Sequence, residues 1–467
     1  MEIKDYEISL NNLDNYNNII DTLLDEDPIS LDNFISTYNI LFTIKKDLFH
    51  MYTYTNLNYK INNTKVNKKE FNNVDIVINK YNKLVNHINH LLTKNYKLND
   101  VVKKLKDKDM IPYFNDIYNH KKSNSDDINE IYEYNNKIKN NFLNKKEFDD
   151  NQLFNVLSEY VKDTEVLARD CNYKYYRDLV LDRDNICSNA ISLMVDTYNS
   201  NKELFTKINR INFDNNIVID KNDCRSYISS SLKDIFGDQY FYKVIYLLDN
   251  CTIFNNKNNE VIGWINLMPK LLINYNNDIS SLRKTSNYVG LGMYLYYQNN
   301  NHIYNYNSNS IIYNVIGYLN ELLVLNSLCN NDKLGNIALN ELLNFYNNNF
   351  IDIINSLCYE DGIHNNINNL NINYIKKNKN YKRYFYNVFN DYNDYKTVLS
   401  VIIATKLYKD IINNNYKYED YIKLLEFNSN DSINELLNIN LNDDYCINYL
   451  LIDTVNYINE LFNKNKK

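Results

Sequence analysis

The feature that most constrains the fold is the near absence of turn residues. The chain of 467 residues holds only 7 glycines and 3 prolines, so the signals of tight β-hairpins are almost missing. Apolar residues instead recur at intervals of three and four, as they do on one face of a helix. The clearest case is residues 74–91, and similar patterns occur at 150–165, 185–210, 311–328, 395–412 and 446–462. The sequence therefore predicts a mainly α fold.

One segment departs from this pattern. Gly263 and Pro269 flank short apolar runs, and residues 270–276, KLLINYN, have the composition of a β-strand. A helix is predicted directly after it, over residues 281–298. This helix contains Gly290 and Gly292, although each glycine inside a helix costs about 1 kcal/mol relative to alanine. A chain that almost never uses glycine must have a reason to place two of them here.

Composition and charge exclude several classes of protein. The excess of Asn, Ile, Lys, Tyr and Asp matches A/T-rich codons and predicts an AT-rich genome, as in some insect viruses and protists. The formal net charge of -7 argues against a general nucleic-acid binder. No long uncharged apolar stretch is present, which argues against a transmembrane helix and a membrane partner. The acidic start MEIKDYEISLNN does not resemble a secretory signal.

The cysteines point to a reducing compartment. They are scattered singly and form no C-x-x-C pair, which is typical of reduced thiols in an intracellular, cytoplasmic protein. The seven are Cys171, Cys187, Cys224, Cys251, Cys329, Cys358 and Cys446.

The glycine-containing helix lies in a stretch that resembles a known family. Residues 269–301, PKLLINYNNDISSLRKTSNYVGLGMYLYYQNNN, resemble the proline-led strand, the connection and the H-E-x-G-H helix of the M3 zinc oligopeptidases, in the oligopeptidase F branch. Residues 313–328, YNVIGYLNELLVLNSL, resemble the segment that supplies the third zinc ligand, a Glu. Residues 48–64, 167–184 and 418–444 are similar to further parts of the family. The chain is shorter than typical members.

The resemblance implies an architecture. It predicts a two-lobed helical body with a central channel and a small β-sheet beside it. We expect an N-terminal helical lobe at 1–150 and a degenerate peptidase-like domain at 151–467, with linkers near 120–128 and 145–151. The family helix has a glycine between its base Glu and its second His, and Gly290 matches it. We interpret Gly290 as a site of close backbone packing that outlasted the chemistry.

The departures from the family motif bear directly on function. The two His ligands of the family fall on Asn287 and Leu291, the base Glu falls on Tyr288, and the third ligand falls on Asn314. Leucine cannot bind a metal, and a neutral amide is a poor zinc ligand. The pKa of an ordinary tyrosine is about 10, so Tyr288 is unsuited to act as the base near neutral pH. The sequence predicts that zinc, the family cofactor, is lost and that no other cofactor is present.

Two further features of the family can be placed on this chain. Residues 380–400 resemble a late segment that supplies a His and tyrosines to the reaction, and Tyr384 falls at the His position. Tyr386 and Tyr392 keep the aromatic pattern there. In the family, a strand beside the channel pairs with the substrate backbone, which predicts a peptide channel lined by Leu272 and Asn274 together with these tyrosines.

Other candidate sites have plainer interpretations. His87 and His90 stand three apart on a helix, but no third ligand is visible nearby, so a solvated or half-buried pair is expected. Residues 374–386 mix basic and aromatic residues, and a solvated loop is favoured over a nucleic-acid site on an acidic chain. Glu321 remains in the second helix, where we favour a structural role.

Three functions remain open from the sequence. The favoured one is a catalytically inactive oligopeptidase-like protein, a pseudopeptidase, that binds a peptide or protein segment or acts as a scaffold. The first alternative is an active zinc oligopeptidase with relocated ligands, although only 6 histidines exist to supply them. The second alternative is an inert structural or interaction protein of a virus or cell. Convergence of three His, Asp or Glu side chains beside residues 284–297 would favour the active enzyme.

Overall fold

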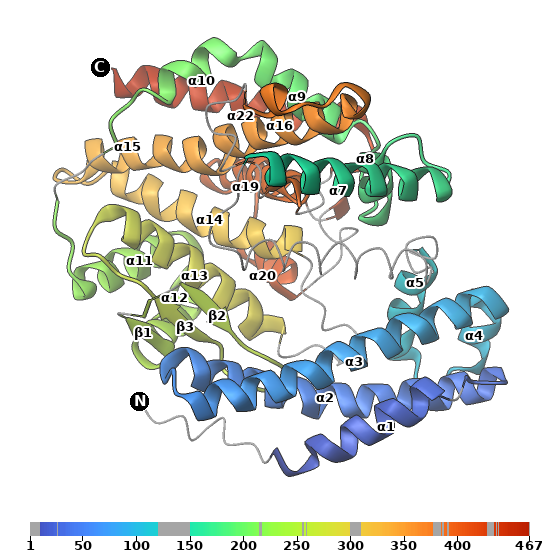
Figure 1. Cartoon of the computed structure of the whole chain (residues 1–467). Coiled ribbons are helices and arrows are strands. Elements are labelled where there is room, and N and C mark those ends of the chain that lie inside the picture. Colours follow the sequence, from blue (N-terminus) through green and yellow to red (C-terminus); the bar gives the residue numbers. More distant parts are fainter. Residues whose placement is uncertain are drawn as a thin grey trace.

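The computed structural model of the chain is built almost entirely from helices (Figure 1). It describes residues 10–25, 27–119, 150–213, 217–254, 256–257, 259–298, 310–376, 384, 387–389, 392–426, 434–435, 437 and 439–466. The predicted linkers at 120–128 and 145–151 fall outside these residues, apart from the last two positions, which begin helix α7. The mainly α fold with a small sheet is confirmed.

The N-terminal part forms a helical group with its own hydrophobic core. Two long helices make an antiparallel hairpin, and each begins at a hydroxyl cap: Ser30 accepts from Asn33 N at 3.3 Å, and Thr64 accepts from Asn67 N at 3.2 Å. Shorter helices cover this hairpin and bury its apolar stripes. The helices are α1 (Leu13–Asp25), α2 (Leu31–Ile61), α3 (Lys65–Asn95), α4 (Leu98–Lys104) and α5 (Ile111–Asn119).

The rest of the chain forms a larger helical group around the main core. A smaller apolar cluster lies where α7 meets α16. The helices are α7 (Asp150–Asp170), α8 (Tyr176–Arg183), α9 (Ala190–Ser200), α10 (Lys202–Ile208), α11 (Lys221–Phe236), α12 (Asp238–Tyr246), α13 (Ile279–Gln298), α14 (Ser310–Cys329), α15 (Gly335–Tyr346), α16 (Asp352–Asn365), α17 (Ile372–Lys376), α19 (Asp394–Ile412), α20 (Tyr418–Glu426) and α22 (Asp444–Asn465).

The sheet has three short strands in the order β1-β3-β2. β1 (Thr252–Phe254) pairs parallel with β3 (Lys270–Ile273), and β2 (Glu260–Ile262) pairs antiparallel with it. All four residues of β3 are buried. The strand predicted at 270–276 thus begins where expected but ends at Ile273, and it is the central strand rather than an edge.

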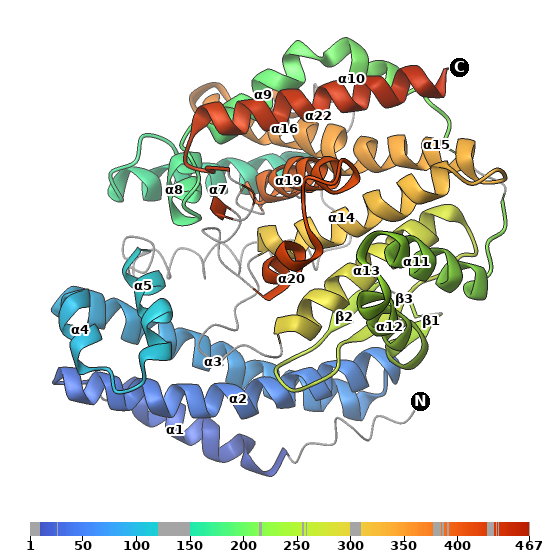
Figure 2. The same ribbon diagram turned by 180° about the vertical axis from the view of Figure 1, so that it is seen from behind.

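Helix α14 lies at the centre of the larger group. It runs between α13 and α19 (Figure 2), and it also packs against α11 and α15. It is the one helix in the described part of the chain that is long and apolar enough to cross a membrane, but 72% of its most apolar stretch is buried inside the protein. That burial is typical of a core helix, so its hydropathy reflects burial against other helices.

The two helical groups meet along one face of α2, which we call the seam. Phe49 stacks on Trp264 with ring centroids 4.9 Å apart, and Trp264 Nε1 donates to the Lys46 carbonyl oxygen at 3.2 Å. His50 Nε2 donates to the Ile265 carbonyl oxygen at 2.8 Å. An ion pair of 3.0 Å joins Lys60 to Glu260 of the edge strand β2. The N-terminal group therefore lies against the sheet (Figure 1).

Candidate functional site

The motif helix α13 starts slightly before its predicted start at 281 and ends at Gln298 as expected. Its first turn is held by Asp278, whose side chain accepts from Ser281 N at 2.6 Å and from Ser281 Oγ at 2.7 Å. An acceptor at this position satisfies a backbone amide that the helix leaves free. The cap fixes where α13 begins. The helical repeat then places Asn287 and Leu291 on the face of α13 that contacts α14.

Two glycines let α13 and α14 approach closely. A Cβ atom at Gly290 would lie 2.6 Å from Asn320 Nδ2 and 2.9 Å from the Ile316 carbonyl oxygen. A Cβ atom at Gly317 of α14 would lie 2.8 Å from Asn287 Nδ2. Each glycine thus makes room for the other helix, and the predicted close packing at Gly290 is confirmed.

Gly292 has a different partner, since its missing side chain faces the sheet. A Cβ atom there would lie 2.8 Å from Leu271 Cδ2 on β3. The two glycines of α13 therefore serve two neighbours, a helix and a strand, and together they set the position of the motif helix between them.

Asn287, which the resemblance places at the first His position, contacts Glu321. Its Nδ2 donates to Glu321 Oε1 at 2.6 Å, while Arg283 Nη1 donates to Glu321 Oε2. Arg283 Nε donates to Glu341 Oε1 at 2.7 Å, and Asn344 Nδ2 donates to Glu341 Oε2 at 3.1 Å. We call these five residues, on α13, α14 and α15, the polar junction.

The three charged residues of the polar junction are buried, whereas Asn287 and Asn344 are half-buried, and burial of the charges governs the electrostatics. Arg283, Glu321 and Glu341 are only 4%, 3% and 1% exposed. Burial favours the neutral forms, but the attraction of Glu321 and Glu341 outweighs it and raises the pKa of Arg283, which stays a cation. Burial raises the pKa of Glu321, while Arg283 and Asn287 pull it back down.

Tyr288, which the resemblance places at the position of the base, points toward the sheet. Its hydroxyl donates to the Asn259 carbonyl oxygen, just before β2, at 3.4 Å. Burial raises its pKa, and the charges of Glu321 and Glu260 raise it further. Tyr288 is therefore even more fully protonated near neutral pH than an ordinary tyrosine, so it holds no free base there, and its contact is structural.

The remaining motif positions are Leu291 and Asn314. Leu291 is buried, 6% exposed, and its Cδ2 lies where Gly317 leaves room on α14. Asn314 is half-buried near the start of α14. Leu291 lies on α13 and Asn314 on α14, two of the three helices that carry the polar junction.

The predicted channel residues of the strand need correction. Leu272 is fully buried in β3, between two other strands, so a peptide cannot pair beside it. Asn274 lies beyond the strand, and its backbone amide donates to Asn259 Oδ1 at 2.5 Å. The outer strands of the sheet are β1 and β2. Sequence alone missed this because each of these strands has only three residues.

The late tyrosines contact α16. The Tyr384 hydroxyl donates to Asp352 Oδ1 at 2.7 Å and accepts from Asn355 Nδ2 at 2.9 Å. Tyr392 is buried, has a positive φ of 57°, and its backbone amide donates to Glu360 Oε1 at 2.8 Å. Tyr386 lies outside the described residues.

Comparison with known proteins addresses the fold. No family model matches the sequence, and no curated protein is significantly similar to it. Solved structures do match. A candidate peptidase of Chlamydophila abortus superposes with a TM-score of 0.78 at 13% identity, covering 98% of both chains. Oligoendopeptidase F of Enterococcus faecium gives 0.62 at 12% identity over 97% of this chain and 98% of that one. A protein described as an oligoendopeptidase F of Bacillus anthracis gives 0.62 at 14% identity, over 100% and 99%.

The chain has the oligoendopeptidase F fold.

The residues that the resemblance places at the zinc motif do not fit zinc. Zinc prefers thiolate, imidazole and carboxylate ligands, whereas these positions hold a leucine, a tyrosine and two amides. The Asn287 amide is already engaged with Glu321. Within the residues that the structure describes, no group of three or more His, Cys, Asp or Glu side chains is arranged to hold a metal. We therefore derive no step through a metal at this site.

Sequence reasoning missed Arg283 and Glu341, and it saw Glu321 without a partner. Arg283 stands one helical turn before Asn287, so its place on the same face of α13 could have been noticed. Glu341 lies 58 residues from Arg283 along the chain. No local pattern indicates that contact.

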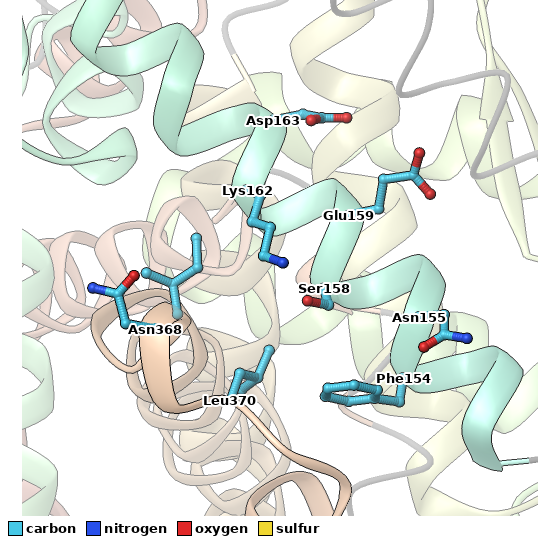
Figure 3. Close-up of a pocket in the computed structure, with 9 residues that line it drawn as sticks. Phe154, Asn155, Ser158, Glu159, Lys162, Asp163, Asn368 and Leu370 are labelled. Atoms are coloured by element: carbon cyan, nitrogen blue, oxygen red, sulfur yellow. The ribbon is translucent and has the colours of Figure 1, made fainter.

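A separate hollow of about 570 Å³ lies between α7 and the short helical turn Ile367–Asn369 (Figure 3). Glu159 and Asp163 on its α7 side are one turn apart, and burial together with the Glu159 charge raises the pKa of Asp163. None of the sequence-predicted site residues lines this hollow. Its lining is Phe154, Asn155, Ser158, Glu159, Lys162, Asp163, Ile367, Asn368 and Leu370.

The other sequence candidates have structural roles. His87 and His90 are half-buried, as expected, and His87 Nε2 contacts Asp27 Oδ1 at 2.8 Å. Glu321, expected to be structural, is a buried partner of two α13 side chains. Of residues 374–386, only 374–376 and 384 are described.

Proposed function

We propose that this chain is a non-catalytic protein on an oligoendopeptidase F fold, one that binds a peptide or protein segment without cutting it. The observation that carries the proposal is the state of Asn287. At the position where the resemblance places a zinc-binding His, the nitrogen of this half-buried amide donates to the buried Glu321, which a guanidinium already neutralises. Tyr288 and Leu291 add no group suited to activate water.

The partner class follows from the fold and the charge. A peptide in an extended form would add to the outer edge of β1 or β2, since β3 is already paired on both sides. The net charge of -7 and the core role of α14 support a partner that is neither nucleic acid nor membrane. We place the protein in the cytoplasm because its cysteines are dispersed, as is typical of reduced thiols in an intracellular protein.

One observation favours a second candidate, a scaffold without peptide binding. β3 is the central strand and is paired on both sides, so a peptide could pair only with β1 or β2. Each of these strands is shorter than the strand that the sequence predicted for this role. A scaffold needs no open edge.

The test combines metal content, cleavage and binding on the unaltered protein. We expect no stoichiometric zinc by elemental analysis and no cleavage of a mixed peptide library, with or without chelator. A fluorescent peptide library screened by anisotropy separates the two candidates, since saturable binding supports the peptide binder and its absence supports the scaffold. Chelator-sensitive cleavage would overturn both.

A reversion variant sharpens the test. Asn287→His, Tyr288→Glu, Leu291→His and Asn314→Glu together restore the family pattern. Glu321 is already placed to accept from the side chain at 287, as the partner of a metal-binding His does, so we expect zinc binding to return more readily than turnover. The control omits Leu291→His and should bind zinc far more weakly.

A further inference from the structure

We infer that the Arg283 guanidinium is an internal substitute for a bound cation, and that it makes the junction of α13, α14 and α15 independent of metal. This inference rests on the proposed function, because it explains how a metal-site helix pair persists without its metal. It assigns to Arg283 a role that neither the motif nor the fold predicts.

The hydrogen bonds of the polar junction form a closed set. Each oxygen of the two carboxylates receives one side-chain donor: Glu321 Oε1 from Asn287, Glu321 Oε2 from Arg283, Glu341 Oε1 from Arg283 and Glu341 Oε2 from Asn344. A buried carboxylate left without donors would be strongly destabilising. Here the carboxylates are satisfied by protein groups alone.

The charge balance shows why a cation is required at this place. Two carboxylates that face one guanidinium leave a net charge of about -1, and without the guanidinium two negative charges would repel each other in a dry interior. Carboxylate and amide oxygens are also the ligands that hard divalent cations prefer. Arg283 thus occupies the position between Glu321 and Glu341 where such an ion would otherwise balance the charge.

The geometry explains why the residue is arginine. Nη1 and Nε of one planar group reach two different carboxylates on two different helices. A lysine ammonium is a compact point charge and lacks this fixed fork. The side chain also starts from α13 one turn before Asn287, so one helix face supplies both donors to Glu321.

The experiment follows the melting temperature of Arg283→Ala in chelator and in millimolar Ca²⁺, Mg²⁺ or Mn²⁺. The wild-type protein should melt at the same temperature in all these conditions. The variant should melt several degrees lower in chelator and regain at least half of the loss with one of the cations. The carboxylate oxygens of Glu321 and Glu341 can then bind the ion in place of the guanidinium. A folded variant that loses stability but responds to no cation overturns the inference, as does a wild-type protein that is destabilised by chelator.

Two further variants control the result. Lys409→Ala removes a cation that pairs with Asp453 at 2.5 Å elsewhere in the larger group, and its loss should not be recovered by cations. Arg283→Ala combined with Glu341→Gln removes the charge conflict, so it should be more stable than Arg283→Ala alone and insensitive to cations. If Arg283→Ala does not fold in any condition, folding of the double variant supports the inference and its failure overturns it. Peptide cleavage by the wild-type protein would refute the proposed function without changing these melting results.

Discussion

Gly290 shows how one missing methyl group can set the distance between two helices. Its position faces both a side chain and a backbone carbonyl of α14, and the carbonyl cannot rotate away. We expect Gly290→Ala to lower the free energy of unfolding by about 1–3 kcal/mol through overpacking, although alanine is the better helix former by about 1 kcal/mol. Denaturant melts would measure this change.

Gly362→Ala is the matched control for this prediction. A Cβ atom at Gly362 would meet only the Tyr374 hydroxyl, at 3.0 Å, which is the far end of a side chain that can move. We expect a change within about 1 kcal/mol there, as the helix gains propensity and loses little packing. If Gly290→Ala changed stability no more than Gly362→Ala, α13 and α14 would tolerate more separation at their crossing than the geometry indicates.

Lys45 on α2 gives a prediction with a definite pH dependence. Burial lowers the pKa of Lys45 from 10.5 to about 8. Between these two values the unfolded chain binds a proton that the folded chain does not, so stability falls as the pH drops from 10.5 to 8 and stays reduced below that. Lys45→Met should therefore stabilise the protein at pH 7 by about 1–3 kcal/mol, and the gain should fade above pH 10.

Denaturant melts at pH 7 and pH 10 would measure the effect. Lys46→Met, at an exposed neighbouring position, is the control and should change stability little at either pH. An equal gain at both pH values for Lys45→Met would assign the effect to added apolar contact rather than to the buried charge.

At the scale of elements, Asn274 ties the end of β3 to the loop before β2. Its backbone amide donates to Asn259 Oδ1, and its Nδ2 donates to the Lys257 carbonyl oxygen at 3.3 Å. Asn274→Pro removes both donors, so we expect faster amide hydrogen exchange in β2, with a change in global stability of about 1 kcal/mol or less. Asn274→Ala keeps the backbone donor and should have the smaller effect. Unchanged exchange in β2 would show that the loop is held elsewhere.

The elements also show how far the sequence can be read. The periodicity at 395–412 and the strand start at Lys270 correspond closely to α19 and β3, because burial of one face or of a whole strand leaves a local pattern. The segment 185–210 reads as one pattern but contains two helices that meet at Asn201. A break of a single residue is too small to disturb the hydrophobic period.

The candidate site was predictable only in part. The helices α13 and α14, to which the resemblance assigns the motif positions, could be predicted because each leaves a local pattern within a few turns. The polar junction could not be, because Arg283 is 38 residues from Glu321 and 58 from Glu341, and pairing over such separations depends on tertiary packing. The central place of β3 was missed for a similar reason, since strands of three residues carry almost no signal of their own.

At the scale of the whole molecule, Trp264 reports on the seam rather than on a peptide at β3. It stacks on Phe49 and donates to a carbonyl of α2, so its surroundings depend on contact between the two helical groups. Phe49→Ala removes an aromatic pair worth about 0.5–1.5 kcal/mol and lets water reach the indole. We expect a red shift of tryptophan emission with unchanged helical content by circular dichroism.

The same variant should separate the unfolding of the two groups. Each has its own hydrophobic core, so weakening the seam should turn one transition into two, with tryptophan emission changing before most helix is lost. Phe71→Ala is the control, because Phe71 stacks on Tyr59 at 5.7 Å inside the N-terminal group. A red shift of equal size in that variant would show that Trp264 senses the whole N-terminal group and not the seam alone.

The closed polar junction has a consequence for how the protein is made. During synthesis α13 and α14 leave the ribosome before α15, so Arg283 contacts Glu321 first. The junction is completed only when Glu341 has emerged. Every part of the junction is then encoded in the chain itself, so under the proposed function we expect maturation without a loading step that waits on metal supply or a metal chaperone. Newly made protein should reach its final form equally fast in zinc-starved and zinc-replete cells.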